Sequence, residues 1–207
     1  MRRINKGAPM PEFTQFVHTQ HPVRWEDAAG VRRVWREYML KYEQHYLSGY
    51  TELFIAGPNQ THIDHFKKKS LFGNLVFCWE NFVVDSLDDG YGARYKDVHI
   101  HSIEDNQRLI DPVKEDAARY FQYEITGKMV PANGLSDDDA KRAQFTIDMF
   151  NLNEGSLKER RKVILNTDPH AYDGLSDEEI KKSLHKFGFP SVVEQWLRER
   201  RNQENLL

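Results

Sequence analysis

The chain has 207 residues, with 29 Lys and Arg against 32 Asp and Glu and a formal net charge of −3 at pH 7. Hydrophobic residues make up 39% and aromatic residues 12%, which is enough for a packed core and excludes wholesale disorder. Proteins that engulf a nucleic acid are usually more basic, so any phosphate-binding surface is expected to be a local patch.

The cysteine content and the apolar runs restrict the class further. The single cysteine, Cys78, excludes an internal disulfide and a cysteine-only zinc site. No apolar run approaches the roughly 20 residues that span a bilayer. The first residues lack the apolar core of a signal peptide. We therefore expect a cytoplasmic protein that does not contact a membrane.

The N-terminal quarter divides into an arm and a helix. Residues 1–23 contain Pro9, Pro11 and Pro22, and we expect an extended arm with a short strand or turn. Residues 24–48 have a helical pattern, with arginines opposite a stripe of apolar and aromatic side chains that is typical of a core-facing surface. The stripe consists of Val31, Val34, Trp35, Tyr38, Met39, Tyr42 and Tyr46.

The next part of the chain predicts strand, loop, strand and helix in that order. Turn signals rich in glycine, proline and asparagine lie at residues 57–59, 73–74 and 90–92. Segments with strand composition lie at residues 52–55, 61–66, 75–79 and 82–84. Residues 93–96 open a short helix, so residues 52–97 predict a ββα unit.

The remaining chain is expected to be mainly helical. Asp111-Pro112 suits a helix start, which predicts a helix over residues 113–121, and residues 120–131 follow as a hairpin. Ser136 and Ser176 each begin a capping box, a helix-start signal. Further helices are expected at residues 157–165 and 191–202. The fold class is then α+β: a mostly helical domain over residues 1–165 around a core at about 52–97, with a helical extension over 166–207.

The densest metal-ligand chemistry is the run Thr61-His62-Ile63-Asp64-His65-Phe66. On a strand, His62 and Asp64 share one face and His65 takes the other, so a turn or bulge is needed to bring Asp64 and His65 to one phosphate. Asp64 is a hard oxygen ligand suited to Mg²⁺ or Mn²⁺. His65, with a reference pKa of roughly 6.5, can take a proton at neutral pH.

Other residues supply supporting roles. Asn81, sixteen residues after His65, is expected to brace the loop between the strands by backbone hydrogen bonds. Asp88 and Asp89 are expected to close the metal site from the helix start. For His62 three roles stay open: a metal ligand, a hydrogen-bonding partner of a ligand, or a residue that stabilises the fold.

The motifs together resemble the HNH endonucleases, and more narrowly the PtuB-like nucleases of Septu and retron-associated anti-phage systems. The central motifs are followed by matches further along the chain, and the resemblance covers about residues 1–165. The matching motifs are His62-Ile63-Asp64-His65-Phe66, Lys68-Lys69-Ser70, Trp79-Glu80-Asn81, Ile110-Asp111-Pro112, Gly127-Lys128-Met129-Val130-Pro131 and Met149-Phe150-Asn151-Leu152-Asn153.

The resemblance implies a ββα-metal (HNH) unit in a nuclease that cleaves DNA or RNA, tRNA included, and works with an SMC-like ATPase, PtuA. It implies His65 as general base, Asn81 and Lys96 as further catalytic residues, and a divalent ion on Asp64 with Asp88 or Asp89 and with His62. Lys96 would match a lysine close to the scissile strand.

The chain also departs from this family. Relatives usually hold a structural zinc with two Cys-x-x-Cys pairs, and the corresponding residues 48–51 and 86–89 contain no cysteine, so no structural zinc is expected. The far metal ligand falls on Gly90 or Ala93, neither of which coordinates by its side chain. The alternative function is therefore a catalytically weakened, HNH-derived binding or scaffold subunit for the ATPase.

Overall fold

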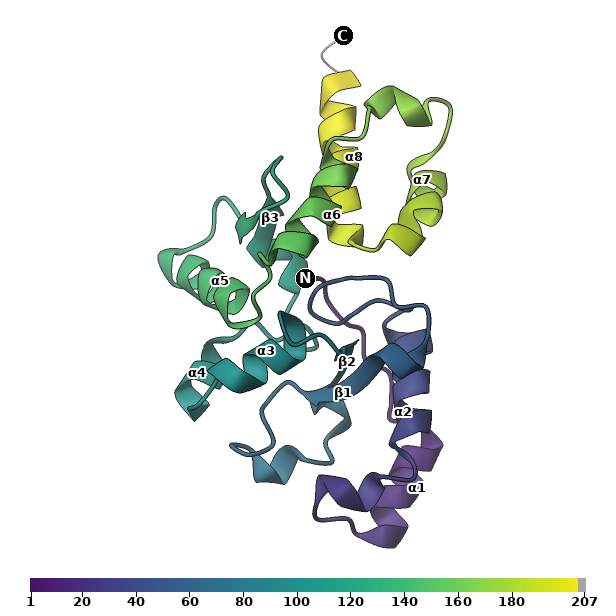
Figure 1. The fold of residues 1–207 in the computed structure, drawn as a ribbon, viewed down its shortest axis with the longest axis vertical. Coiled ribbons are helices and arrows are strands. Elements are labelled where there is room, and N and C mark those ends of the chain that lie inside the picture. Colours follow the sequence, from purple (N-terminus) through teal and green to yellow (C-terminus); the bar gives the residue numbers. More distant parts are fainter. Residues whose placement is uncertain (205–207) are drawn as a thin grey trace.

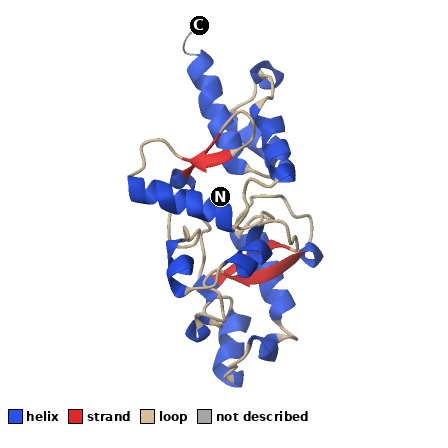
Figure 2. Ribbon diagram, turned by 60° about the vertical axis from the view of Figure 1, so that its left-hand side comes forward, coloured by secondary structure: helices blue, strands red, loops and turns tan. Residues whose placement is uncertain are grey.

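The computed structural model describes residues 1–204 and has a mostly helical α+β fold (Figure 1). In this part of the chain, the strands are β1 (Thr61–His65), β2 (Phe82–Ser86), β3 (Phe121–Tyr123) and β4 (Met129–Pro131). The helices are α1 (Pro11–Gln20), α2 (Arg32–Tyr38), α3 (Gly92–His99), α4 (Ile103–Arg108), α5 (Asp137–Met149), α6 (Gly155–Leu165), α7 (Asp177–Leu184) and α8 (Pro190–Glu204). The strands pair as two small antiparallel sheets, and helices surround both (Figure 2). The expected fold class is confirmed at this level.

The β1–β2 hairpin divides the hydrophobic core into two clusters. Its register pairs Ile63 with Val84 and His65 with Phe82. Because successive strand side chains point to opposite faces, Val83 packs in one cluster while Phe82 and Val84 pack in the other. Helix α3 follows β2 directly, so the expected order of strand, strand and helix is confirmed.

Two segments with strand composition do not form ladders. Residues 52–55 contribute only an isolated bridge, between Leu47 and Phe54, and residues 75–79 lie in turns and short 3-10 segments. Trp79 is nevertheless 1% exposed, and its indole N–H donates to Glu43 Oε1 at 3.0 Å. Apolar composition signals burial, and burial does not require strand pairing.

The expectation of an extended N-terminal arm is wrong for its second half. Helix α1 begins at Pro11, whose fixed φ suits the first turn of a helix. The helix forms because Phe13 gains a buried site, with ring centroids 5.0 Å from both Trp35 and Trp79. Figure 1 shows α1 and α2 side by side near the hairpin.

The long helix expected over residues 24–48 is shorter and irregular. Helix α2 covers residues 32–38 and continues as a π-helical turn at Met39–Glu43. Trp35 and Met39 are buried as expected, but Val34 and Tyr42 are 49% and 58% exposed. Val34 is adjacent to the buried Trp35 in α2 and therefore points to another side of the helix, while the π-helical turn changes the angular spacing at Tyr42.

The helix expected over residues 113–121 is also absent. Asp111 Oδ1 accepts hydrogen bonds from the backbone N–H groups of Val113 and Lys114, which satisfies these donors in a turn. A short 3-10 segment and β3 follow. The β3–β4 hairpin and the N-caps at Ser136 and Ser176 are confirmed, and Ser176 forms both bonds of its capping box.

The C-terminal helices pack against the rest of the fold. In α8 the expected apolar face is buried, and the Gln195 side chain bonds to the backbone of Tyr123 in β3 at 2.9 and 2.7 Å. Ser191 Oγ donates to Glu52 Oε1 at 2.6 Å. Residues 166–204 therefore share contacts with the preceding domain. In residues 1–204, no helix is long and apolar enough to cross a membrane.

Candidate functional site

The edge of β1 that faces away from β2 borders a cavity of about 380 Å³, which we call the His65 cavity. Its lining consists of Trp25, Glu26, Arg32, His62, Ile63, Asp64, His65, Lys69, Arg94 and Asp97. Two of its carboxylates, Asp64 and Asp97, already pair with Lys96 Nζ at 2.6 and 3.2 Å. Arg94 pairs with Asp89 at 2.8 Å, so within residues 1–204 Arg32 and Lys69 are the cations of this lining that keep no carboxylate partner, beside the carboxylate of Glu26.

His65 is held in one orientation at this cavity. Its ring packs edge-on against Trp25 and Phe82, at centroid distances of 4.6 and 5.2 Å. Nε2 lies 2.9 Å from Val76 O. Because a carbonyl only accepts, Nε2 carries the hydrogen and the lone pair of the neutral ring is on Nδ1. Burial lowers the pKa of His65, partly offset by the Val76 carbonyl, so the ring is neutral at pH 7.

Asp64 lies in a buried ion pair. Its Oδ2 accepts from Lys96 Nζ at 2.6 Å and from the Tyr50 hydroxyl at 2.5 Å. Lys96 Nζ also donates to His65 O at 2.9 Å. Burial alone would raise the pKa of Asp64, but Lys96 and Tyr50 outweigh it and hold the pKa below its usual value. The ammonium group of Lys96 therefore occupies the position of a cation ligated by Asp64.

His62 lies on the same face of β1 as Asp64, as strand alternation predicts. Its Nδ1 is buried and has no hydrogen-bond partner among residues 1–204. Burial lowers the pKa of His62, and the charge of Asp64 offsets this only in part. The ring is thus a neutral group with a free nitrogen near the cavity.

Asn81 braces the loop between β1 and β2, as expected. Its Oδ1 accepts from Lys67 N at 2.7 Å, and its Nδ2 donates to Lys67 O at 3.0 Å and to Leu75 O at 3.3 Å. Leu75 immediately precedes Val76, whose carbonyl orients the His65 ring. Asn81 therefore acts on His65 through the loop and does not line the His65 cavity.

The structure does not bring Asp88 and Asp89 to Asp64, contrary to the expectation from the sequence. Asp88 Oδ1 caps its own turn by accepting from Gly90 N, and its side chain lines a separate cavity with Arg160. Asp89 is exposed and pairs with Arg94 at 2.8 Å. In the described residues no group of three His, Cys, Asp or Glu side chains is arranged to hold a metal ion. Because the Asp64 carboxylate is already paired with Lys96, the side chains at this site do not fit the divalent ion that the resemblance implies.

The first of the two segments that correspond to the cysteine pairs, residues 48–51, meets Asp85 of β2 in a cluster of hydrogen bonds. Ser48 Oγ is bonded to Asp85 Oδ1 and accepts from Thr51 Oγ1 at 2.8 Å. Asp85 Oδ2 accepts from Ala93 N at 2.7 Å. Asp85 lies one residue before the second segment, residues 86–89. This cluster ties the hairpin to the start of α3, and burial raises the pKa of Asp85 to about 7.

Three residues at the site were not predicted from the sequence. Trp25 was not singled out, and Arg32 was assigned to the solvent side of a long helix. Its guanidinium instead lies 5.2 Å from the centroid of the Trp25 ring. Tyr50 was not singled out either, although its place between Ser48 and Thr51 puts it next to a segment expected to meet the hairpin.

No protein-family model matches the chain, and a comparison with curated proteins found no match. What the protein does must therefore be inferred from the geometry of the site and from its motifs.

Proposed function

We propose that the protein is an endonuclease of the HNH kind that hydrolyses phosphodiester bonds in DNA or RNA, with His65 as the general base. The observation that carries this proposal is the His65 ring. Its Nε2 is fixed by Val76 O, its Nδ1 has no partner in residues 1–204, and the ring lines a cavity that also holds Arg32 and Lys69. The order β1, β2, α3 supports the proposal because it is the ββα order of the family that the sequence resembles.

The side chains at the His65 cavity divide the chemistry between them. The neutral His65 ring takes the proton of an attacking water, and its lowered pKa keeps the base form populated at pH 7. Arg32 and Lys69 bind the phosphate oxygens and stabilise the negative charge that develops on them. Asn81 is a positioning residue, since it holds the loop that orients the ring.

The second candidate function is nucleic-acid binding without cleavage. The observation that favours it is the pair of Lys96 and Asp64, which uses the carboxylate that an HNH nuclease would offer to a metal ion. Ala93, at one of the two possible far-ligand positions, has no donor. Under this second candidate function, the His65 cavity binds the phosphodiester backbone without cleaving it, and the protein serves as a scaffold.

The direct experiment is cleavage of plasmid DNA and of tRNA with Mg²⁺, with Mn²⁺ and with chelator. The proposal expects cleavage by the wild type and a loss of at least about 10²-fold in His65→Ala. The matched control is His101→Ala, which changes an exposed histidine outside the His65 cavity. Undiminished cleavage by His65→Ala contradicts the assignment of the base. Tight binding without any cleavage favours the second candidate.

From the resemblance alone, we also propose that the protein works with a PtuA-like ATPase as an effector of anti-phage defence. The test is co-expression with such an ATPase followed by size-exclusion chromatography. A shared peak supports the partnership, and separate elution at micromolar concentration speaks against it.

A further inference from the structure

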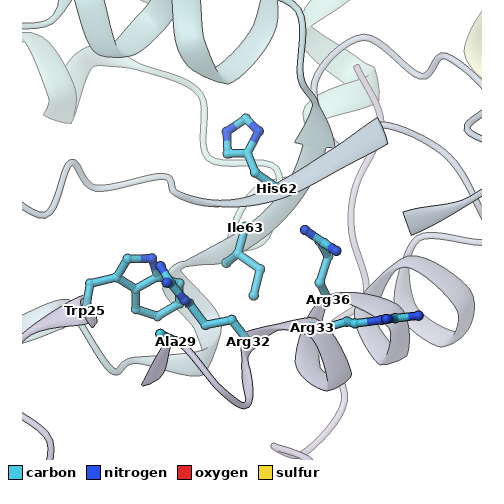
Figure 3. Close-up of a pocket in the computed structure, with 7 residues that line it drawn as sticks. All are labelled: Trp25, Ala29, Arg32, Arg33, Arg36, His62 and Ile63. Atoms are coloured by element: carbon cyan, nitrogen blue, oxygen red, sulfur yellow. The ribbon is translucent and has the colours of Figure 1, made fainter. Parts of the chain in front are cut away.

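A second cavity lies beside β1 and α2, and Figure 3 shows the residues that line it. It has a volume of about 260 Å³ and is called the Arg36 cavity here. It shares Trp25, Arg32, His62 and Ile63 with the His65 cavity. Because the two cavities share this wall, a chain-like ligand in one can extend into the other.

The residues that distinguish the Arg36 cavity are Ala29 and two arginines of α2, Arg33 and Arg36. Figure 3 shows the Arg36 side chain directed toward β1 and the Arg33 side chain directed away. Arg33 Nε is satisfied by Glu37 at 2.8 Å. No Asp or Glu is among the described residues that line this cavity, so an anion there meets no opposing carboxylate on its wall.

Arg36 has donors that the described residues do not use. Its Nη1 donates to Thr61 O at 2.9 Å, which anchors the guanidinium to β1. Its Nε is buried and has no acceptor in residues 1–204. The guanidinium as a whole lines the cavity and uses only Nη1 for a hydrogen bond within residues 1–204, so its Nη2 keeps donors for an acceptor that comes from a ligand.

Arg32 connects the two cavities. Its guanidinium lies over the Trp25 ring at 5.2 Å, which places the charge on the wall that both cavities share. A planar guanidinium bonds two oxygens of a phosphate at once, which makes arginine the usual side chain for phosphate recognition.

We propose that the Arg36 cavity binds the phosphate next to the one at His65. The protein then binds a nucleic-acid strand through two successive phosphates, one in each cavity. This inference rests on the proposed function, because it assumes that the first phosphate lies in the His65 cavity.

The test compares two probes by NMR titration: a thymidine dinucleotide with one phosphodiester and a trinucleotide with two. The wild type is expected to bind the trinucleotide roughly tenfold more tightly, the gain of one charged hydrogen-bonded contact. Arg36→Gln is expected to remove this gain and leave the dinucleotide affinity unchanged. Arg33→Gln is the matched control, one turn away on the same helix, and is expected to keep the gain.

A longer oligonucleotide supplies a second readout. Arg36→Gln is expected to lower the slope of log affinity against log salt by about one, as for loss of one phosphate contact. The inference is overturned if Arg36→Gln weakens both probes equally, or if the wild type binds the two probes alike. If neither these probes nor the corresponding uridine probes bind while the protein is folded, the proposed function fails as well, which distinguishes the two failures.

Discussion

The buried pair of Lys96 and Asp64 allows a quantitative prediction about the substitution Lys96→Met. Methionine keeps the length of the side chain but removes its charge, so the Asp64 carboxylate stays buried with only the Tyr50 hydroxyl as partner. Breaking a buried ion pair from one side costs about 3–5 kcal/mol. Asp97, the other partner of Lys96, is 48% exposed and keeps its hydration. The expected loss of unfolding free energy in Lys96→Met is therefore attributed to the unpaired carboxylate of Asp64.

The double variant Asp64→Asn/Lys96→Met is the control, because it removes the buried charge of Asp64 and leaves only the exposed Asp97 without its partner. We expect it to recover at least about 2 kcal/mol of the loss, as neutral replacements of buried pairs do. The pair holds the pKa of Asp64 below its usual value, so its contribution is present above pH 4 and is lost as pH falls through the folded-state pKa. Urea unfolding at pH 7 and at about pH 3, below the usual pKa of an aspartate, measures both effects. Equal destabilisation of the single and double variants, or a single-variant loss below about 1 kcal/mol, would refute this reasoning.

Two further predictions concern residues near the site. Burial raises the pKa of Asp85 to about 7, so between pH 4 and 7 the folded chain holds a proton that the unfolded chain has released, and the contribution of Asp85 to stability falls as pH rises. From pH 5 to 8 wild type is expected to lose about 3 kcal/mol relative to Asp85→Asn in urea titrations, and a difference independent of pH would contradict this. Asn81→Ala removes three hydrogen bonds to the β1–β2 loop and is expected to cost about 2–4 kcal/mol and to broaden the His65 NMR signals. A stable variant with unchanged His65 signals would rule out the bracing role.

Local patterns predicted the parts of the fold whose signals are short-range. The order of β1, β2 and α3, the β3–β4 hairpin and the Ser176 capping box each depend on a few neighbouring residues. The expectations failed where tertiary contacts decided the outcome. Helix α1 forms around the buried Phe13, and α2 loses its periodicity at a π-helical turn that no local pattern marked.

At the candidate site, too, the sequence predicted the features that depend on local spacing and missed those that depend on tertiary contacts. The alternation of His62, Asp64 and His65 and the loop contacts of Asn81 follow from sequence spacing. Sequence spacing did not predict the two partners of Asp64. Lys96 was assigned a place beside the scissile strand, and Tyr50 was not considered. Both reach Asp64 from positions 32 and 14 residues away, through packing that a linear pattern does not encode. Asp88 and Asp89 were misplaced because their composition fits a ligand pair and a turn equally well.

The most direct test of the central claim is a titration of the ¹⁵N-histidine-labelled protein with a short oligonucleotide, followed by NMR. A phosphodiester in the His65 cavity places negative charge beside the ring, so the His65 signals are expected to shift and the pKa of His65 to rise on binding. The signals of the exposed His101 are expected to stay unchanged. Shifts confined to other histidines, or saturable binding that leaves His65 unaffected, would contradict the assignment of this cavity as the phosphodiester site.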